Sequence, residues 1–175
     1  MLKILYVTVL ARPEPRHAAR LHAGPFVFRA SVGRSGIGWQ KREGDGYTPA
    51  GTFRLGKGFF RNDRLKRPAW IKPLSPMRPN LGWCDDPKSQ LYNRPVTRCS
   101  RDRHENLWRD DNVYDIVFTT NHNERPRLLN GGSAIFFHLS RADYRATEGC
   151  VAICISDMRK LLGLVGERTR IVIRR

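Results

Sequence analysis

Short apolar runs alternate along the chain with turns that are rich in glycine and proline. The runs contain many β-branched and aromatic side chains, which is typical of strands. We expect strands at residues 2–10, 26–33, 52–60, 114–119, 133–138, 150–155 and 169–173. One later segment has helical spacing instead, with apolar residues at 158, 161, 162 and 165 between Ser156, a good N-cap, and Gly166. The pattern predicts a mostly β fold, in which a mixed sheet curls into a sandwich or barrel beside one or two short helices.

A long segment without clear periodicity, residues 61–109, interrupts the strand pattern. It holds six of the eleven prolines and three of the four tryptophans, Trp70, Trp83 and Trp108. Aromatic side chains in irregular segments commonly pack over a sheet or line a groove, which a linker does not do. We therefore expect a loop-rich insertion inside a single domain that spans residues 1–175.

A histidine ends one apolar run and a cysteine opens the next. His138 closes the run that starts at Ser133, and Cys150 begins the run that ends at Ile155. If the two strands are paired or adjacent, both side chains lie at one end of a sheet. The thiolate is the nucleophilic form of cysteine, and an imidazolium neighbour lowers the pKa of a thiol from about 8.5 towards neutrality. The pair predicts a cysteine acyl-transfer site, although a free cysteine is also common as a small buried apolar residue.

The remaining cysteines and histidines show no metal-binding pattern. Cys84, Cys99, Cys150 and Cys154 have no C-x-x-C spacing, and the five histidines form no H-x-x-x-H or H-E-x-x-H motif. We expect no metal site, no cofactor and no disulfide. Cys154 lies four residues after Cys150, which predicts a core residue on the same face of the strand.

A second segment strengthens the catalytic interpretation. Residues 41–53 contain a lysine, the turn Gly44-Asp45-Gly46 and the pattern Thr48-Pro49-x-Gly51-x-Phe53, and the later pattern is His138 followed by Thr147-x-Gly149-Cys150. From about Val27 to Ile173, this series resembles the L,D-transpeptidase family, the YkuD-type catalytic domain that remodels bacterial peptidoglycan. The resemblance implies a YkuD-like mixed sheet. The Thr48–Phe53 motif is also explained by backbone geometry alone, as a wall of the cleft.

The resemblance and the residue chemistry together suggest a role for each catalytic candidate. Cys150 attacks a carbonyl, and His138 takes the thiol proton and later gives a proton to the leaving amine. The backbone N–H groups of Gly149 and Cys150 are the candidates for the oxyanion hole. Thr147 is the candidate for orienting His138 through its carbonyl or its hydroxyl.

Three departures from the family pattern concern the substrate. Glu148 stands where the family often has a histidine, Ala152 stands where it usually has a substrate-binding arginine, and the loop from His138 to Cys150 is shorter than in many members. The resemblance to the family therefore supports the cysteine chemistry of this chain better than it supports a donor specificity. Hydrolysis of a peptide or amide bond in peptidoglycan stays open beside cross-linking.

A subset of YkuD-type proteins is also similar within residues 61–109. The matching patterns are Trp83-Cys84-Asp85-Asp86, Tyr92-Asn93-Arg94-Pro95 and His104-Glu105-x-Leu107-Trp108. The likeness implies a substrate-binding cap that uses Trp83, Tyr92, Asn93, Arg94 and His104, and the alternative is a local hydrogen-bond network.

With Ala152 in place of arginine, a donor carboxylate must be held by another cation. Arg94 is our first candidate for this cation, before Arg141 and Arg145 of the shortened loop. The alternative for Arg94 is an ion pair with Asp85 or Asp86.

The chain carries 32 Lys and Arg residues against 16 Asp and Glu residues, a net charge of +16. The charge fits an acidic polymer such as the cell wall, nucleic acid, or a solvated basic surface. No nucleic-acid-binding motif accompanies it, so we expect peptidoglycan stem peptides as partners and no specific nucleic acid. A non-enzymatic basic module that binds an anionic polymer is the alternative function. We expect a monomer.

Two kinds of sequence segment bear on the compartment, a membrane span and a signal peptide. No apolar stretch reaches 18 residues, so no membrane span is expected. The first ten residues have one lysine and no small-residue cleavage site, which favours a first strand over a signal peptide. The family implies the periplasm or cell wall, whereas the lack of a visible signal peptide leaves a cytoplasmic location open.

Overall fold

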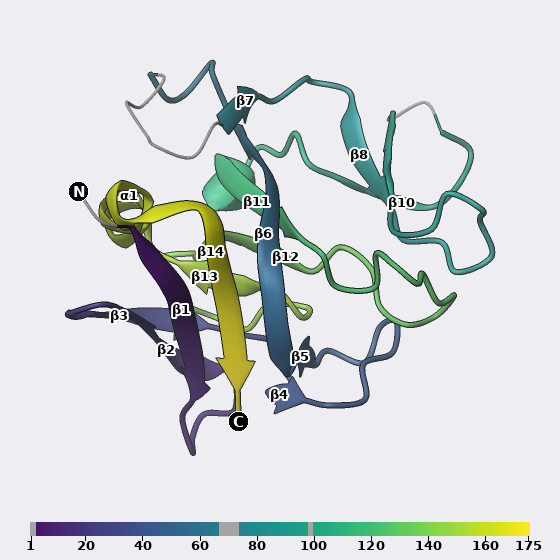
Figure 1. Ribbon diagram of the computed structural model, residues 1–175. Helices are drawn as coiled ribbons and strands as arrows, with labels where there is room; N and C mark the ends of the chain where they lie inside the picture. The colour runs from purple at the N-terminus through teal and green to yellow at the C-terminus, as the bar shows by residue number, and fades with distance from the viewer. Residues whose placement is uncertain (1–2, 67–73, 98–99) are drawn as a thin grey trace.

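The computed structural model describes residues 3–66, 74–97 and 100–175. Within them, nine strands form one mixed sheet in the order β11-β12-β13-β3-β2-β1-β14-β6-β7. The strands are β1 (Ile4–Ala11), β2 (Ala18–Ala23), β3 (Phe26–Ser31), β6 (Gly51–Phe60), β7 (Leu74–Pro76), β11 (Ile116–Thr120), β12 (Phe136–Leu139), β13 (Val151–Ile153) and β14 (Val165–Arg174). Strand β11 also pairs with β6, so the sheet closes into a barrel-like arrangement (Figure 1). The predicted mostly β fold with a curled mixed sheet is confirmed.

Strand β2 was absent from the strands expected from the sequence. It pairs with β3 from Ala18↔Ser31 to Ala23↔Phe26, and the two form a hairpin around Gly24, which has φ +58°. Its residues have low intrinsic strand preference, but Ala19, Leu21 and Ala23 alternate into the core. Pairing on both sides and burial of one face therefore decide its conformation.

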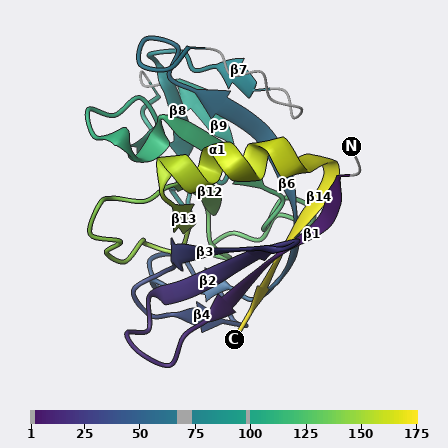
Figure 2. The same cartoon turned by 90° about the vertical axis from the view of Figure 1, so that its left-hand side faces the viewer.

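The barrel encloses the main apolar core. Alternate residues of the strands point inward, because successive side chains of a strand lie on opposite faces. Helix α1 (Ile155–Leu164) lies across the curled sheet between β13 and β1 (Figure 2) and adds Met158, Leu161 and Leu162 to this core. The predicted apolar stripe is confirmed for these three residues, whereas Val165, its fourth predicted member, begins β14.

The ends of the helix differ from those predicted. The N-cap is Cys154, and the helix passes directly into β14 at Val165, so Ser156 lies in the first turn and Gly166 lies within β14. Cys154 is therefore part of the helix start and half-buried, which corrects its expected place in the core. No helix within the described ranges is long and apolar enough to cross a membrane.

The described residues of the segment 61–109 pack beside the barrel and include a small three-stranded sheet in the order β10-β8-β9 (Figure 1). Its strands are β8 (Leu81–Cys84), β9 (Pro95–Thr97) and β10 (His104–Asn106). A second apolar cluster joins this sheet to the outside of the barrel. The cluster comprises Met77, Leu107, Val113, Tyr114, Val117, Phe136 and Cys150. Trp70 and Cys99 lie outside the described residues.

Two short elements complete the fold. Strands β4 (Ile37–Gly38) and β5 (Thr48–Pro49) form a two-stranded pair, and the 3₁₀ helix η1 (Asn112–Tyr114) precedes β11. Helix η1 delivers Tyr114 to the second apolar cluster, and β5 brings Thr48 close to Cys150. Both elements therefore end beside the predicted nucleophile.

Candidate active site

The structure brings His138 and Cys150 to one cavity. Strands β12 and β13 are paired in parallel, with His138 opposite Ala152, and Cys150 directly precedes β13. The neighbours Phe137 and Val151 point into the barrel core. His138 and Ala152 therefore face the outside of the barrel, where both line a cavity of about 630 Å³ together with Cys150. The expected juxtaposition of the two strands is confirmed.

The Cys150 thiol is buried and held by backbone groups. It donates to the carbonyl oxygen of Ala134 at 3.1 Å and accepts from the Phe136 N–H at 3.3 Å. Burial raises the pKa of the thiol to about 12, and the nearby carboxylate of Glu105 adds to this shift. The thiol is therefore protonated in the resting protein.

His138 is buried as well and is neutral at pH 7. Its Nδ1 lies 2.9 Å from the carbonyl oxygen of Leu139, and its ring meets that of Tyr114 edge-on at 5.0 Å. Burial lowers the pKa of His138 to about 4, although backbone hydrogen bonds to Leu139 and Val113 oppose the shift. An imidazolium that lowers the pKa of Cys150 was expected from the sequence. The structure contradicts this for the resting protein, because desolvation disfavours both charged forms.

Thr147 does not orient His138 in the structure. Its hydroxyl donates to the Cys150 carbonyl at 2.7 Å and accepts from the Gly149 N–H at 3.2 Å. Its N–H donates to the Val32 carbonyl at 2.9 Å, and its own carbonyl accepts from the Arg34 N–H at 3.0 Å. Thr147 therefore closes the turn before the cysteine, and the carbonyl of Leu139 has the orienting position that the sequence suggested for Thr147.

Gly149 occupies a position that no other residue suits. Its φ is +137°, and a Cβ atom there would lie 2.8 Å from the carbonyl oxygen of Tyr47. Since its N–H already donates to Thr147, it must exchange this partner before it can serve an oxyanion. The amide of Cys150 is the better candidate of the two.

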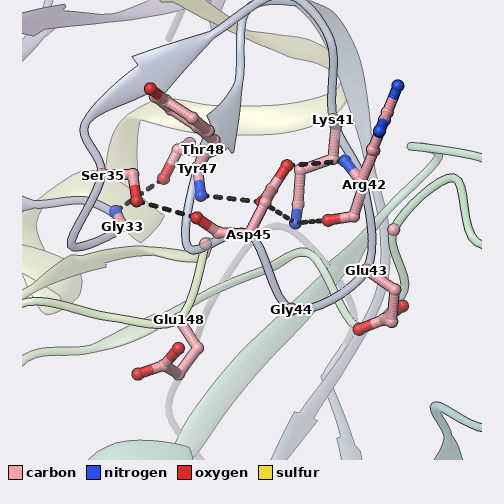
Figure 3. Close-up of polar contacts among 12 residues, drawn as sticks. Gly33, Ser35, Lys41, Arg42, Glu43, Gly44, Asp45, Tyr47, Thr48 and Glu148 are labelled. Atoms are coloured by element: carbon pink, nitrogen blue, oxygen red, sulfur yellow. Dashed lines mark hydrogen bonds and ion pairs between the residues drawn. The ribbon is translucent and has the colours of Figure 1, made fainter.

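Polar contacts centred on Asp45 hold the loop from Lys41 to Thr48 together (Figure 3). The carboxylate of Asp45 accepts from the Lys41 ammonium at 2.6 Å, from the Arg42 N–H at 2.6 Å and from the Tyr47 N–H at 2.9 Å. Partial burial raises the pKa of Asp45, but these hydrogen bonds outweigh it, so the pKa is lowered overall. Thr48 Oγ1 accepts from the Gly33 N–H at 2.8 Å and lies 3.4 Å from the Cys150 carbonyl oxygen. The Thr-Pro motif therefore contacts the backbone of Cys150 and not its thiol.

Replacing Lys41 by methionine should destabilise the protein by about 2 kcal/mol or more, because the Asp45 carboxylate loses its partner in a largely buried pair. The side chains of Lys41 and Asp45 are only 5% and 19% exposed. The folded-state pKa of Asp45 lies below 3.8, so the pair stabilises the fold above this pH and the difference between variant and wild type should shrink as the pH falls further.

Urea denaturation of both proteins at pH 7 and pH 3 measures the effect of Lys41→Met. The exposed Lys57→Met, in β6, is the matched control. Equal stability of the two variants at pH 7 would show that the Lys41 pair contributes nothing to the fold.

Three of the predicted cap residues form a hydrogen-bond network instead of lining the cavity. The Asn93 side chain accepts from Trp83 Nε1 at 2.9 Å and from the Ala134 N–H at 3.1 Å, and it donates to the carbonyls of His122 and Asn123. The Tyr92 hydroxyl donates to Glu43. The alternative interpretation of the motif, a local network, is the one that the contacts support for these three residues.

Arg94 and His104 also lie outside the cavity lining. Arg94 is exposed, and Asp85 pairs with Arg103 at 3.1 Å rather than with Arg94. His104 Nδ1 contacts the carbonyl of Asp102 at 2.8 Å. Because side chains alternate along β10, the neighbouring Glu105 lines the cavity in place of His104. Of the six predicted substrate-binding residues, only Arg141 lines the cavity.

Glu105, Tyr114, Arg109 and Asp111 were not among the predicted site residues. Its carboxylate accepts from the Tyr114 hydroxyl at 2.5 Å, and burial raises its pKa. Arg109 forms two hydrogen bonds of 2.8 Å with Asp111, and Arg141 contacts the same carboxylate at 2.6 Å. The sequence pattern His-Glu-x-Leu-Trp includes Glu105 beside His104. Which of these two side chains faces the cavity depends on the register of β10, which the sequence does not reveal.

The cavity lining mixes both charges. Its carboxylates are Glu43, Asp85, Glu105 and Glu148, and its guanidinium groups are Arg109, Arg141 and Arg145. No three His, Cys, Asp or Glu side chains of the described residues are placed to hold a metal ion. The arrangement supplies a thiol, a neutral imidazole and charged groups for a polar substrate.

The sequence matches the family model of the YkuD L,D-transpeptidase catalytic domain over residues 17–173. No curated protein matches the chain at a significant level.

Three of the solved structures that match the chain are similar to it at low identity. Bd1075 from Bdellovibrio bacteriovorus has a TM-score of 0.45 and 17% identity, and the match covers 96% of this chain and 47% of that one. The helical cell shape determining protein Pgp2 from Campylobacter jejuni has a TM-score of 0.45 and 16% identity, covering 97% and 47%. L,D-transpeptidase 1 from Mycobacterium tuberculosis has a TM-score of 0.40 and 10% identity, covering 96% and 61%. The chain thus spans less than two thirds of the length of each.

Proposed function

Because the chain belongs to the YkuD family of L,D-transpeptidase catalytic domains, which acts on peptidoglycan, we propose that it is a cysteine enzyme for acyl transfer on stem peptides. The observation that carries the proposal is the shared cavity of Cys150 and His138, which reach it from paired parallel strands. A merely structural cysteine has no need of a cavity, a neighbouring imidazole and an obligatory glycine before it.

The neutral resting pair defines how the reaction starts. Burial of both groups disfavours a thiolate–imidazolium pair. The thiol proton therefore passes to His138 as the sulfur attacks the substrate carbonyl. The thiol must first exchange its hydrogen bond to Ala134 for one to the imidazole.

The later steps follow from the same groups. The tetrahedral oxyanion is stabilised by the Cys150 N–H, with Gly149 as a second donor once it leaves Thr147. His138 returns its proton to the leaving amine, and the C–N bond breaks to leave a thioester on Cys150. A second amine resolves this thioester by transpeptidation, or water resolves it by hydrolysis. The family usually works in the periplasm or cell wall, and we propose the same compartment for this chain.

Incubation of the purified chain with muropeptides tests the proposed function. Mass spectrometry should detect either new cross-linked dimers, which identify a transferase, or shortened stem peptides, which identify a hydrolase. Cys150→Ala under the same conditions is the control. Unchanged muropeptides with the wild-type chain, and no covalent adduct at Cys150 after treatment with a carbapenem, would favour the non-enzymatic binding module.

A further inference from the structure

Ser31 lies in the same row of the sheet as the catalytic histidine. His138 on β12 is opposite Ala152 on β13, and Ala152 is opposite Ser31 on β3. Neighbouring strands lie about 4.8 Å apart, so Ser31 is about 10 Å across the sheet from His138, with only the methyl group of Ala152 between them. All three side chains line the cavity.

The hydroxyl of Ser31 has no hydrogen-bond partner within the described residues, although Ser31 is only 1% exposed. Buried hydroxyl groups are nearly always paired, because burial removes their hydrogen bonds to water. Since Ser31 faces the cavity, the missing partner fits a group that enters with the substrate.

The loop that carries Arg145 contacts strand β3 close to Ser31. The guanidinium of Arg29 lies over the ring of Tyr144, 4.2 Å from its centre. Arg29 is two residues before Ser31 and on the same side of β3, since side chains alternate along a strand. Arg145 follows Tyr144 and lines the cavity with Ser31.

Arg145 also differs from the other two arginines of the lining. Arg109 and Arg141 both pair with Asp111. Residues 3–66, 74–97 and 100–175 contain no carboxylate that pairs with the Arg145 guanidinium. The cavity therefore holds one cation whose charge is not already compensated by the protein.

We propose that Ser31 and Arg145, above the small side chain of Ala152, form a subsite for a carboxylate of the stem peptide. The proposal rests on the proposed function and adds a specificity determinant to it. A carboxylate can accept from the Arg145 fork and from the Ser31 hydroxyl at once, and it satisfies both unpaired groups. Because Ala152 has only a methyl group, it leaves space in the cavity between His138 and Ser31 that a longer side chain would occupy.

The test compares three purified stem tetrapeptides: one with free carboxylates, one amidated at its C-terminus and one amidated on its side chain. Binding to the full chain carrying Cys150→Ala is measured by calorimetry, and kcat/KM is measured with the wild-type thiol. One of the two amidations should weaken binding roughly 10- to 100-fold, which identifies the carboxylate that occupies the subsite.

Variants then assign the preference to the two residues. Arg145→Gln should abolish the discrimination between the free and the amidated peptide, and Ser31→Ala should reduce it several-fold. Ser31→Ala removes an unpaired buried hydroxyl, so its thermal stability should not fall below that of the parent. The exposed Arg94→Gln, outside the cavity, is the matched control and should retain the full discrimination.

The outcomes separate this proposal from the proposed function. Equal binding and turnover of all three peptides, or discrimination that persists in both variants, overturns the subsite while acyl transfer stands. A chain that neither binds nor processes any peptide overturns the proposed function and the subsite with it.

Discussion

Cys150→Ala should reduce turnover of muropeptides by at least about 10⁴-fold, because no other thiol of the described residues lines the cavity. The fold should remain, with a loss of about 1–2 kcal/mol, since the change removes one buried sulfur and its contacts to Ala134 and Phe136. Residual product formation measured by mass spectrometry, beside a urea denaturation curve, gives both quantities.

Cys154→Ala is the matched control for the nucleophile. Its sulfur lies 3.0 Å from the Ser156 hydroxyl at the start of α1, and it does not line the cavity. This variant should keep most of the activity. Equal loss of turnover in both variants, with the fold intact, would refute Cys150 as the sole nucleophile.

His138→Ala should reduce turnover by about 10²- to 10⁴-fold, the usual contribution of a general base, without changing the reactivity of the resting thiol. The pKa of Cys150 is raised to about 12, so alkylation should be slow at pH 7 and should accelerate as the pH rises above 9. Because the pKa of His138 is lowered to about 4, the imidazole stays basic above about pH 5, and activity should fall only below that pH.

Iodoacetamide labelling of Cys150, followed by peptide mapping between pH 6 and 10, checks the resting state. The profile should be the same in the wild type and in His138→Ala, and slower at pH 7 than that of a free cysteine peptide by about 100-fold or more. Rapid wild-type labelling at pH 6 that disappears in His138→Ala would establish a charged pair and contradict the neutral one.

Several features of the fold were accessible from the sequence because they depend on local patterns. Apolar runs bounded by glycine and proline located most strands, and the stripe of Met158, Leu161 and Leu162 located the helix. The motif residues placed His138 and Cys150 at the ends of neighbouring strands. Such signals are strong where one face of an element must be buried. Strand β2 was missed because pairing and burial, not residue preference, decide its conformation.

The residues around the nucleophile needed the tertiary structure. Whether His104 or Glu105 faces the cavity depends on the register of β10 with β8, where His104 pairs with Cys84. Arg94 was preferred over Arg145 because it lies beside Tyr92 and Asn93 in the segment that most resembles a binding cap, but its side chain lies outside the cavity that Arg145 lines. The periodic pattern of apolar residues predicts strands and helices, but it does not predict which distant segments contact each other.

The charge states of the site were decided by burial. The sequence by itself indicated a thiol and an imidazole at one end of a sheet if their two strands pair, and ordinary pKa values made an ion pair the natural expectation. Only the tertiary structure showed that both groups are buried, Cys150 in the second apolar cluster and His138 against the ring of Tyr114. Desolvation there raises the pKa of Cys150 and lowers that of His138. Residue identity and spacing determine which chemistry is available, whereas packing determines the protonation states from which it begins.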